Sequence, residues 1–180
     1  MKKITKEELE VFLRKHKLWL EDNPEGERAN LYEANLYEAN LYGADLRGAD
    51  LYGAYLDKNT YEACPIVCPE EGAFIGFKKA IYISKDGVRR KCIVKLQILK
   101  DAKRSSATTS KCRCSKAKVL SITELDGSDS GMTKAVSDYD TDFIYTVGKT
   151  VSVKDFNDNR WNECAPGIHF FITRQEAVNY

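Results

Sequence analysis

A five-residue repeat in the first third of the chain is the feature that most restricts how it can fold. From Ala29 the sequence reads ANLYE ANLYE ANLYG ADLRG ADLYG AYLDK, and a leucine recurs at every fifth residue from Leu31 to Leu56. A period of five matches neither an α-helix nor a β-strand. It fits a square coil, in which each unit forms one side and turns one corner. Leucine and the alanine two positions before it are expected inside, with Asn, Asp, Gly and Glu at the corners.

This stretch resembles the pentapeptide-repeat family, because five units follow its A-[DN]-L-x-x pattern and only the sixth, with Tyr55, departs from it. The resemblance implies a right-handed quadrilateral β-helix. Some members imitate duplex DNA with a long acidic coil and inhibit topoisomerases, but six units make only about one and a half coils, too few for that role. We therefore expect a scaffold or an oligomerisation platform whose ends are covered by other parts of the chain.

The residues before the repeat predict a helix from about residue 6 to 21. Thr5 and Glu8 form a capping-box pattern, apolar residues follow at helical spacing, and Pro24 comes after the predicted end. We expect the apolar face of this helix to cover the first coil. His16 lies on that face and is interpreted as a packed core histidine.

The pattern changes after the repeat, and the remainder is rich in predicted strands. A capping-box pattern, Thr173 to Glu176, predicts a short terminal helix after the last strand. Together these elements indicate an α+β fold with a mostly antiparallel C-terminal domain. The domains expected are an N-terminal helix and cap (1–28), the repeat coil (29–60) and the C-terminal domain (61–180). The strands are predicted at 74–83, 88–99, 117–125, 143–147, 150–156 and 168–172.

Four phrases of the C-terminal domain carry a second resemblance. They read CPEEGAFIGFKKA, DAKRSSATTSKCRCSKAKV, FIYTVGKTVSV and NRWNECAPGIHFFITRQEAV. The domain, over about residues 64–180, is similar to a family of unknown function of the DUF5758 type, found in phage and bacterial proteins, often behind pentapeptide repeats. The resemblance implies a phage or prophage origin and brings no established activity.

A basic segment inside this domain supplies the candidate ligand site. Residues 100–118 hold seven Lys or Arg and one acid, Asp101, although the whole chain has a net charge of +1. Cations beside hydroxyl groups can bind phosphate or carboxylate. The alternative is a solvated loop whose cations pair with Glu124, Asp126 and the acids among residues 138–142. The residues predicted to bind a small anionic or nucleotide ligand, or a host protein, are Lys103, Arg104, Ser105, Ser106, Lys111, Arg113 and His169.

Catalysis is the second candidate function, and it depends on Cys164 and His169. A thiol and an imidazole can act as nucleophile and base if they meet in space, which would suit an enzyme acting on a nucleotide-like substrate. We lean towards no catalytic activity, and no cofactor is implied. The six cysteines are interpreted as thiols, because their spacing is not that of a zinc site. Nucleic-acid binding is not expected, since the pI is about 7.5 and no basic segment is interleaved with aromatic residues.

The sequence thus predicts a phage-type accessory protein that binds an anionic ligand or a host protein through its C-terminal domain. The repeat would serve as scaffold or as a homo-oligomer interface. No apolar run is long enough to span a bilayer, and residues 1–12 lack the apolar core of a signal peptide. We expect the protein in the cytoplasm, that of the host cell if it is phage-encoded.

Overall fold

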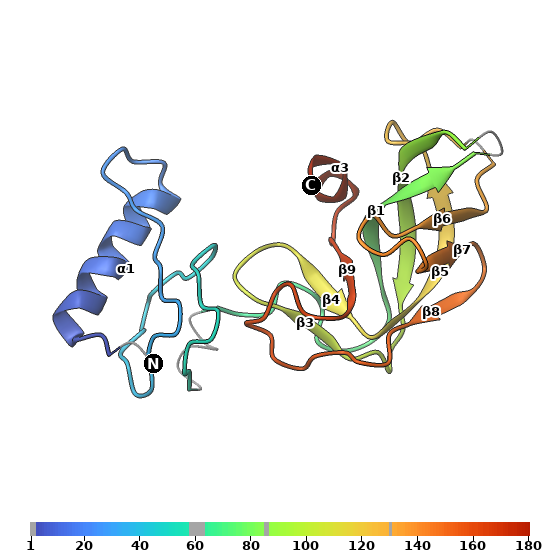
Figure 1. Ribbon diagram of the computed structural model, residues 1–180. Helices are drawn as coiled ribbons and strands as arrows, with labels where there is room; N and C mark the ends of the chain where they lie inside the picture. Colours follow the sequence, from blue (N-terminus) through green and yellow to red (C-terminus); the bar gives the residue numbers. More distant parts are fainter. Residues whose placement is uncertain (1–2, 58–63, 85–86, 130) are drawn as a thin grey trace. The chain divides into compact units, whose positions relative to one another are not determined.

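A computed structural model describes residues 3–57, 64–84, 87–129 and 131–180. The chain forms two compact units (Figure 1), and neither is a single stretch of sequence. The first unit consists of Met1–Val67, Ser106–Thr109 and Asn159–Cys164, and the second contains the rest. The predicted boundary between repeat and C-terminal domain, at residues 60 and 61, lies outside the described residues.

The first unit begins with helix α1, Lys6–Leu20, which confirms the predicted N-terminal helix. Both halves of its capping box are present, since Glu8 N donates to Thr5 Oγ1 at 3.2 Å and Thr5 N donates to Glu8 Oε2 at 2.8 Å. The helix buries Leu9 and His16. His16 Nδ1 accepts a hydrogen bond from the backbone N–H of Ala29, the first residue of the repeat, at 3.2 Å. The helix therefore covers the start of the repeat, with its histidine bonded to the repeat backbone.

The repeat (residues 29–57) places its leucines inside and pairs residues twenty positions apart. Leu31, Leu36, Leu41, Leu46 and Leu51 are each at most 3 % exposed. Parallel bridges join Asn30 to Asp50 and Asn35 to Tyr55. An offset of twenty residues is four units, so the sixth unit lies beside the second. Burial of five leucines supplies the main stabilising free energy of this segment, at about 1.5–3 kcal/mol each.

Each of the first five units turns in the same way. The amide of the alanine that starts a unit donates to the carbonyl of the preceding leucine, as in Ala34 N to Leu31 O at 3.1 Å. The Asn or Asp side chain accepts from the amide two residues on, as in Asn30 Oδ1 from Tyr32 N at 3.1 Å. The last residue of the unit has a positive φ. Gly43, Gly48 and Gly53 adopt it without strain, whereas Glu33 and Glu38 adopt it at φ 52° and 59°.

Two segments from the second half of the sequence cover the other end of the repeat. Thr108 O accepts from Gly48 N at 2.6 Å, and Thr108 Oγ1 donates to Ala49 O at 2.9 Å. Arg160 donates from Nη2 to Cys64 O at 2.7 Å and from Nε to Ser106 O at 2.8 Å. Ala107 and Trp161 join the hydrophobic core of the repeat. Residues 106–109 and 159–164 therefore belong to this unit, although they lie far from the repeat in the sequence.

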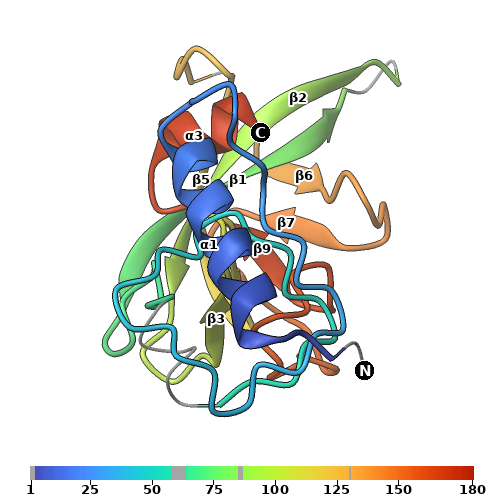
Figure 2. The same ribbon diagram turned by 90° about the vertical axis from the view of Figure 1, so that its left-hand side faces the viewer.

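The second unit contains a six-stranded antiparallel sheet in the order β7-β6-β1-β2-β5-β8. Strands β1 and β2 form a long hairpin with the register Phe74↔Ile98 to Ile83↔Arg89. Strand β6 lies beside β1, and β7 lies beside β6 (Figure 2). Cys92, Val94, Leu96 and Ile98 of β2 are buried on one face. The strands are β1 Phe74–Ile83, β2 Arg89–Ile98, β5 Lys116–Thr123, β6 Lys134–Val136, β7 Ile144–Thr146 and β8 Thr150–Ser152.

A second sheet has three strands in the order β3-β4-β9, namely Arg104–Ser106, Cys112–Cys114 and Ile168–Phe170. Within the basic segment, a strand was predicted only from residue 117 onwards. The segment instead contains β3 and β4 as well as the start of β5. A Cβ on Gly76 of β1 would lie 2.5 Å from the ring of Phe170, so glycine is needed there for the close approach of β9. Phe77 and Phe171 extend this contact with two backbone hydrogen bonds of 2.8 Å.

The chain ends in helix α3, Arg174–Asn179, whose predicted capping box between Thr173 and Glu176 is present. The helix packs against β1 and β2, with Ala177 buried beside Ile93 and Phe171. An N-terminal helix and a mostly antiparallel C-terminal region make the chain an α+β protein, as predicted. In the part of the chain that the structure describes, no helix has both the length and the apolar character to cross a bilayer.

Candidate binding sites

Arg104, at the start of β3, uses its guanidinium group to hold neighbouring loops. Nη1 donates to Gly72 O at 2.8 Å and to Pro69 O at 3.2 Å, while Nη2 donates to Leu99 O at 2.9 Å and to Lys100 O at 3.1 Å. The guanidinium also lies over the ring of Phe74, 5.3 Å from its centroid. Nε donates to Ala102 O at 3.1 Å as well. This predicted ligand residue therefore has a structural role, and an anion would have to compete with five carbonyl groups for it.

Arg113, in β4, is 3 % exposed and is also held by backbone carbonyls. Its Nη1 donates to Asn157 O and to Pro166 O, both at 3.1 Å, and its guanidinium lies 5.3 Å from the ring centroid of Phe156. Carbonyl oxygens are neutral, so these two bonds orient the positive charge without neutralising it. The guanidinium is thus a fixed cation inside the second unit.

Two lysines of the basic segment form surface ion pairs, but with other acids than those expected. Lys103 Nζ lies 2.8 Å from Asp158 Oδ2, and Lys116 Nζ lies 2.7 Å from Asp101 Oδ2. The side chains of Lys103 and Asp158 are 61 % and 69 % exposed. Exposed pairs of this kind contribute only about 0–1 kcal/mol. The charge of Lys103 is therefore accessible to an incoming anion. Lys111, another of the predicted ligand residues, is half-buried.

Three of the predicted ligand residues lie in one row across the three-stranded sheet. Arg113 of β4 is the register partner of His169 of β9. Ser115 N donates to Lys103 O at 2.9 Å, and from this antiparallel alignment we infer that Ser105 of β3 lies opposite Arg113. The Ser105 side chain is buried, and its hydroxyl has no hydrogen-bond partner among the described residues. Side chains of one row share a face of a sheet, so the side chains of Ser105, Arg113 and His169 leave the backbone on the same face.

Ser106 and Cys164, by contrast, belong to the first unit. The Ser106 hydroxyl accepts from Val67 N at 2.8 Å and so has a structural role there. Cys164 is exposed, whereas His169 belongs to the second unit. The predicted pairing of Cys164 with His169 therefore stays a prediction.

Cys164 lines a pocket of about 270 Å³ in the first unit, at the end of the repeat that residues 106–109 cover. Its wall includes Arg28, Tyr52, Trp161 and the carboxylate of Glu163. The carboxylate is held in place, since Glu163 Oε1 accepts from the Thr108 backbone N–H at 3.1 Å. No sequence pattern indicates this pocket, because its wall comes from parts of the chain more than 100 residues apart.

The other cysteines described are buried thiols, and those of β4 resist ionisation. Cys112 and Cys114 are two apart in a strand and therefore share a face. A hydrogen bond between the thiols of Cys112 and Cys68, together with burial, raises the pKa of Cys112. Burial raises the pKa of Cys114 to about 12. Among the described residues, no three His, Cys, Asp or Glu side chains are arranged to hold a metal ion.

Comparison with protein-family models matches both resemblances. Residues 64–177 match the family of unknown function DUF5758, and residues 27–58 match the pentapeptide-repeat model. Because the first match covers more than half of the chain, the protein belongs to the DUF5758 family. No curated protein and no solved structure matches it significantly.

The family boundary and the structural boundary differ. The DUF5758 match begins at residue 64, yet residues 64–67, 106–109 and 159–164 of the matched region are part of the first unit. The family region thus supplies the segments that cover the end of the pentapeptide repeat.

Proposed function

We propose that this protein is a phage-type accessory protein that binds an anionic ligand, such as a phosphate-bearing small molecule, or an acidic surface of a host protein. The binding site is the row formed by Ser105, Arg113 and His169, with Lys103 at its edge. The protein acts without catalysis of its own, in the cytoplasm of the host cell.

The observation that carries the proposal is the buried Ser105 hydroxyl without a hydrogen-bond partner among the described residues, in the same row as two cationic or titratable side chains. A buried polar group left unbonded costs about 1–3 kcal/mol, so such a group is a candidate for bonding to a ligand. Its neighbour Arg113 is held in orientation by two carbonyls, which lowers the entropy lost when an anion binds.

The repeat has a supporting role in this proposal, as a short right-handed quadrilateral β-helix that serves as scaffold or as an oligomerisation platform. The parallel bridges at an offset of twenty residues and the repeated turn at each corner support this geometry. Its two ends are covered by His16 of α1 and by Thr108.

The test is calorimetric titration of the purified chain with pyrophosphate and with ATP. We expect binding that weakens about tenfold in Ser105→Ala and in His169→Gln, since each removes one polar contact. Lys118→Gln is the matched control, because Lys118 is an exposed cation of β5 outside the row. Equal affinity in all three variants would refute the site. Co-purification from host lysate followed by mass spectrometry then identifies the natural ligand or partner.

The alternative, an enzyme acting on a nucleotide-like substrate through Cys164 and His169, has one supporting observation. Cys164 is an exposed thiol at the wall of a pocket. Assay of nucleotide hydrolysis by the wild-type chain, Cys164→Ala and His169→Gln decides between the two proposals. Turnover that is lost in both variants would favour the enzyme, and turnover that survives in either would exclude this pair.

A further inference from the structure

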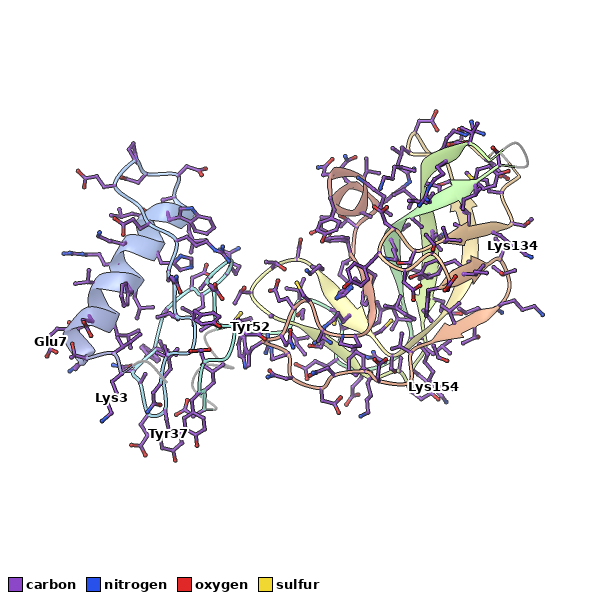
Figure 3. The ribbon with its side chains drawn as sticks, in the orientation of Figure 1. Lys3, Glu7, Tyr37, Tyr52, Lys134 and Lys154 are labelled. Carbon is purple, nitrogen blue, oxygen red and sulfur yellow. The ribbon has the colours of Figure 1, made fainter. Side chains whose placement is uncertain are left out.

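Stacked tyrosines line the outside of the repeat. Tyr32, Tyr37, Tyr42, Tyr52 and Tyr55 are between 45 % and 99 % exposed. Tyr32 stacks on Tyr52 with ring centroids 5.6 Å apart and an interplanar angle of 12°. Tyr37 stacks on Tyr55 at 5.5 Å and 29°. The stacks follow from the offset of twenty residues, which brings one unit beside the fourth unit after it. Figure 3 labels Tyr37 and Tyr52, which both come from turns of the repeat.

Each stack is flanked by carboxylates. Glu33 follows Tyr32 and Asp50 lies two residues before Tyr52, while Glu38 follows Tyr37 and Asp57 lies two residues after Tyr55. Asp57 accepts from the backbone N–H of Glu38 at 3.1 Å, which places these two acids together. Residues 29–57 contain five acidic residues and one arginine. The surface around the rings is therefore negatively charged.

We propose that these two stacks, called here the tyrosine face (Tyr32, Tyr37, Tyr52 and Tyr55), bind an arginine-rich segment of a protein partner. A guanidinium group is planar and weakly hydrated, so it stacks on a tyrosine ring and pairs with carboxylates at the rim of the ring. The negative charge of the face selects a cationic partner and excludes nucleic acid. This surface goes beyond the proposed anion site, since it lies in the other unit and selects the opposite charge.

Glu33 and Glu38 add to the argument through their backbone conformation. They occupy the positive-φ position where the next three units have glycine. Replacement by glycine would relieve strain, because a residue with a side chain is disfavoured at that turn position. A carboxylate at this unfavourable position fits a role in binding. Its replacement by glycine therefore allows the effects on stability and on binding to be measured separately.

The experiment measures the affinity of the whole chain for a labelled oligo-arginine peptide by fluorescence anisotropy, beside oligo-lysine and Gly-Ser peptides of equal length. We expect arginine to bind more tightly than lysine, and the Gly-Ser peptide not to bind. The double variant Tyr32→Ala/Tyr52→Ala should weaken arginine binding about tenfold. Tyr139→Ala is the matched control, since Tyr139 is fully exposed in the second unit.

The variant Glu33→Gly should raise the unfolding midpoint and at the same time weaken arginine binding about threefold. Glu25→Gln, which removes an exposed acid outside the repeat, is the control for net charge. Equal affinity of the arginine peptide for the wild-type chain and the double tyrosine variant would overturn the proposal. It would also be overturned if the chain alone dimerised through the tyrosine face, because a second copy would then be the occupant.

Discussion

Protonation of His16 should destabilise the first unit as the pH falls. The imidazole is fully buried, and its Nδ1 accepts a hydrogen bond from Ala29 N, so protonation of that nitrogen breaks a bond and places a charge in the core. Burial lowers the pKa of His16, with the carbonyl of Arg47 and the carboxylate of Asp45 acting in the opposite direction. The folded protein therefore binds this proton only below the ordinary pKa of about 6.5.

The magnitude follows from proton linkage. Just below about pH 6.5 the unfolded chain carries the proton and the folded chain does not, so the free energy of unfolding falls as the pH is lowered. One proton corresponds to at most about 1.4 kcal/mol per pH unit, or about 2 kcal/mol between pH 6.5 and 5. Above about pH 7 both states hold a neutral imidazole, and the full stability is present.

Urea unfolding monitored by tryptophan fluorescence is the assay. The chain has two tryptophans, Trp19 and Trp161, and both lie in the first unit, so the signal reports that unit alone. Trp19 stacks on His16 with ring centroids 5.3 Å apart. The variant His16→Gln should lose this pH dependence, whereas His169→Gln, which removes the chain's other histidine, should keep it. The reasoning would be refuted by the same slope in wild type and His16→Gln between about pH 6.5 and 5.

Three further predictions concern stability. Gly76→Ala should destabilise the second unit by about 2–4 kcal/mol, because a Cβ there meets the Phe170 ring at 2.5 Å. Thermal melting followed by circular dichroism measures this loss, and an unchanged melting temperature would contradict the close approach. Thr108→Val should cost the first unit about 1–2 kcal/mol, as measured by tryptophan-monitored unfolding, since it removes the bond from Thr108 Oγ1 to Ala49 O. Half-buried Lys78 shares the core-facing side of β1 with Gly76, and burial lowers its pKa to about 8. The free energy of unfolding should therefore rise with pH between about 8 and 10. Lys78→Met should remove that rise and stabilise the chain at neutral pH by about 1–3 kcal/mol, as measured by circular dichroism during urea unfolding.

Local patterns were enough to predict the elements whose signal is contained in adjacent residues. The capping boxes of both helices, the long strands β1, β2 and β5 and the five-residue repeat were all recognisable in this way. Strands β3, β4 and β6 were not predicted, because their sequences, RSS, CRC and KAV, are not runs of β-branched and aromatic residues. Their existence depends on partners such as β9, which lies more than 50 residues after β4 in the sequence.

The candidate sites, too, could be predicted only in part from the sequence. Residue types marked Lys103, Arg113 and His169 as candidates, and the register of β4 and β9 places two of them side by side. That Arg104 would be bonded to five carbonyls could not be predicted, since charge alone does not distinguish a guanidinium that binds a ligand from one that holds a loop. The tyrosine stacks could not be predicted from neighbouring residues, because each stack joins two repeat units that are twenty residues apart.

The sequence by itself determined that Ala29 to Asp57 consists of five-residue repeats and is neither a regular helix nor a regular strand, since neither repeats its apolar residues at that period. It also determined the α+β class and the membership of the C-terminal region in its family. Only the tertiary structure decided how the repeat is closed. Thr108 and Arg160 bond to backbone groups at its end, and those contacts join residues about 60 to 100 positions apart. The sequence of neither partner alone specifies such pairs, because they form only once both segments have folded around the same core.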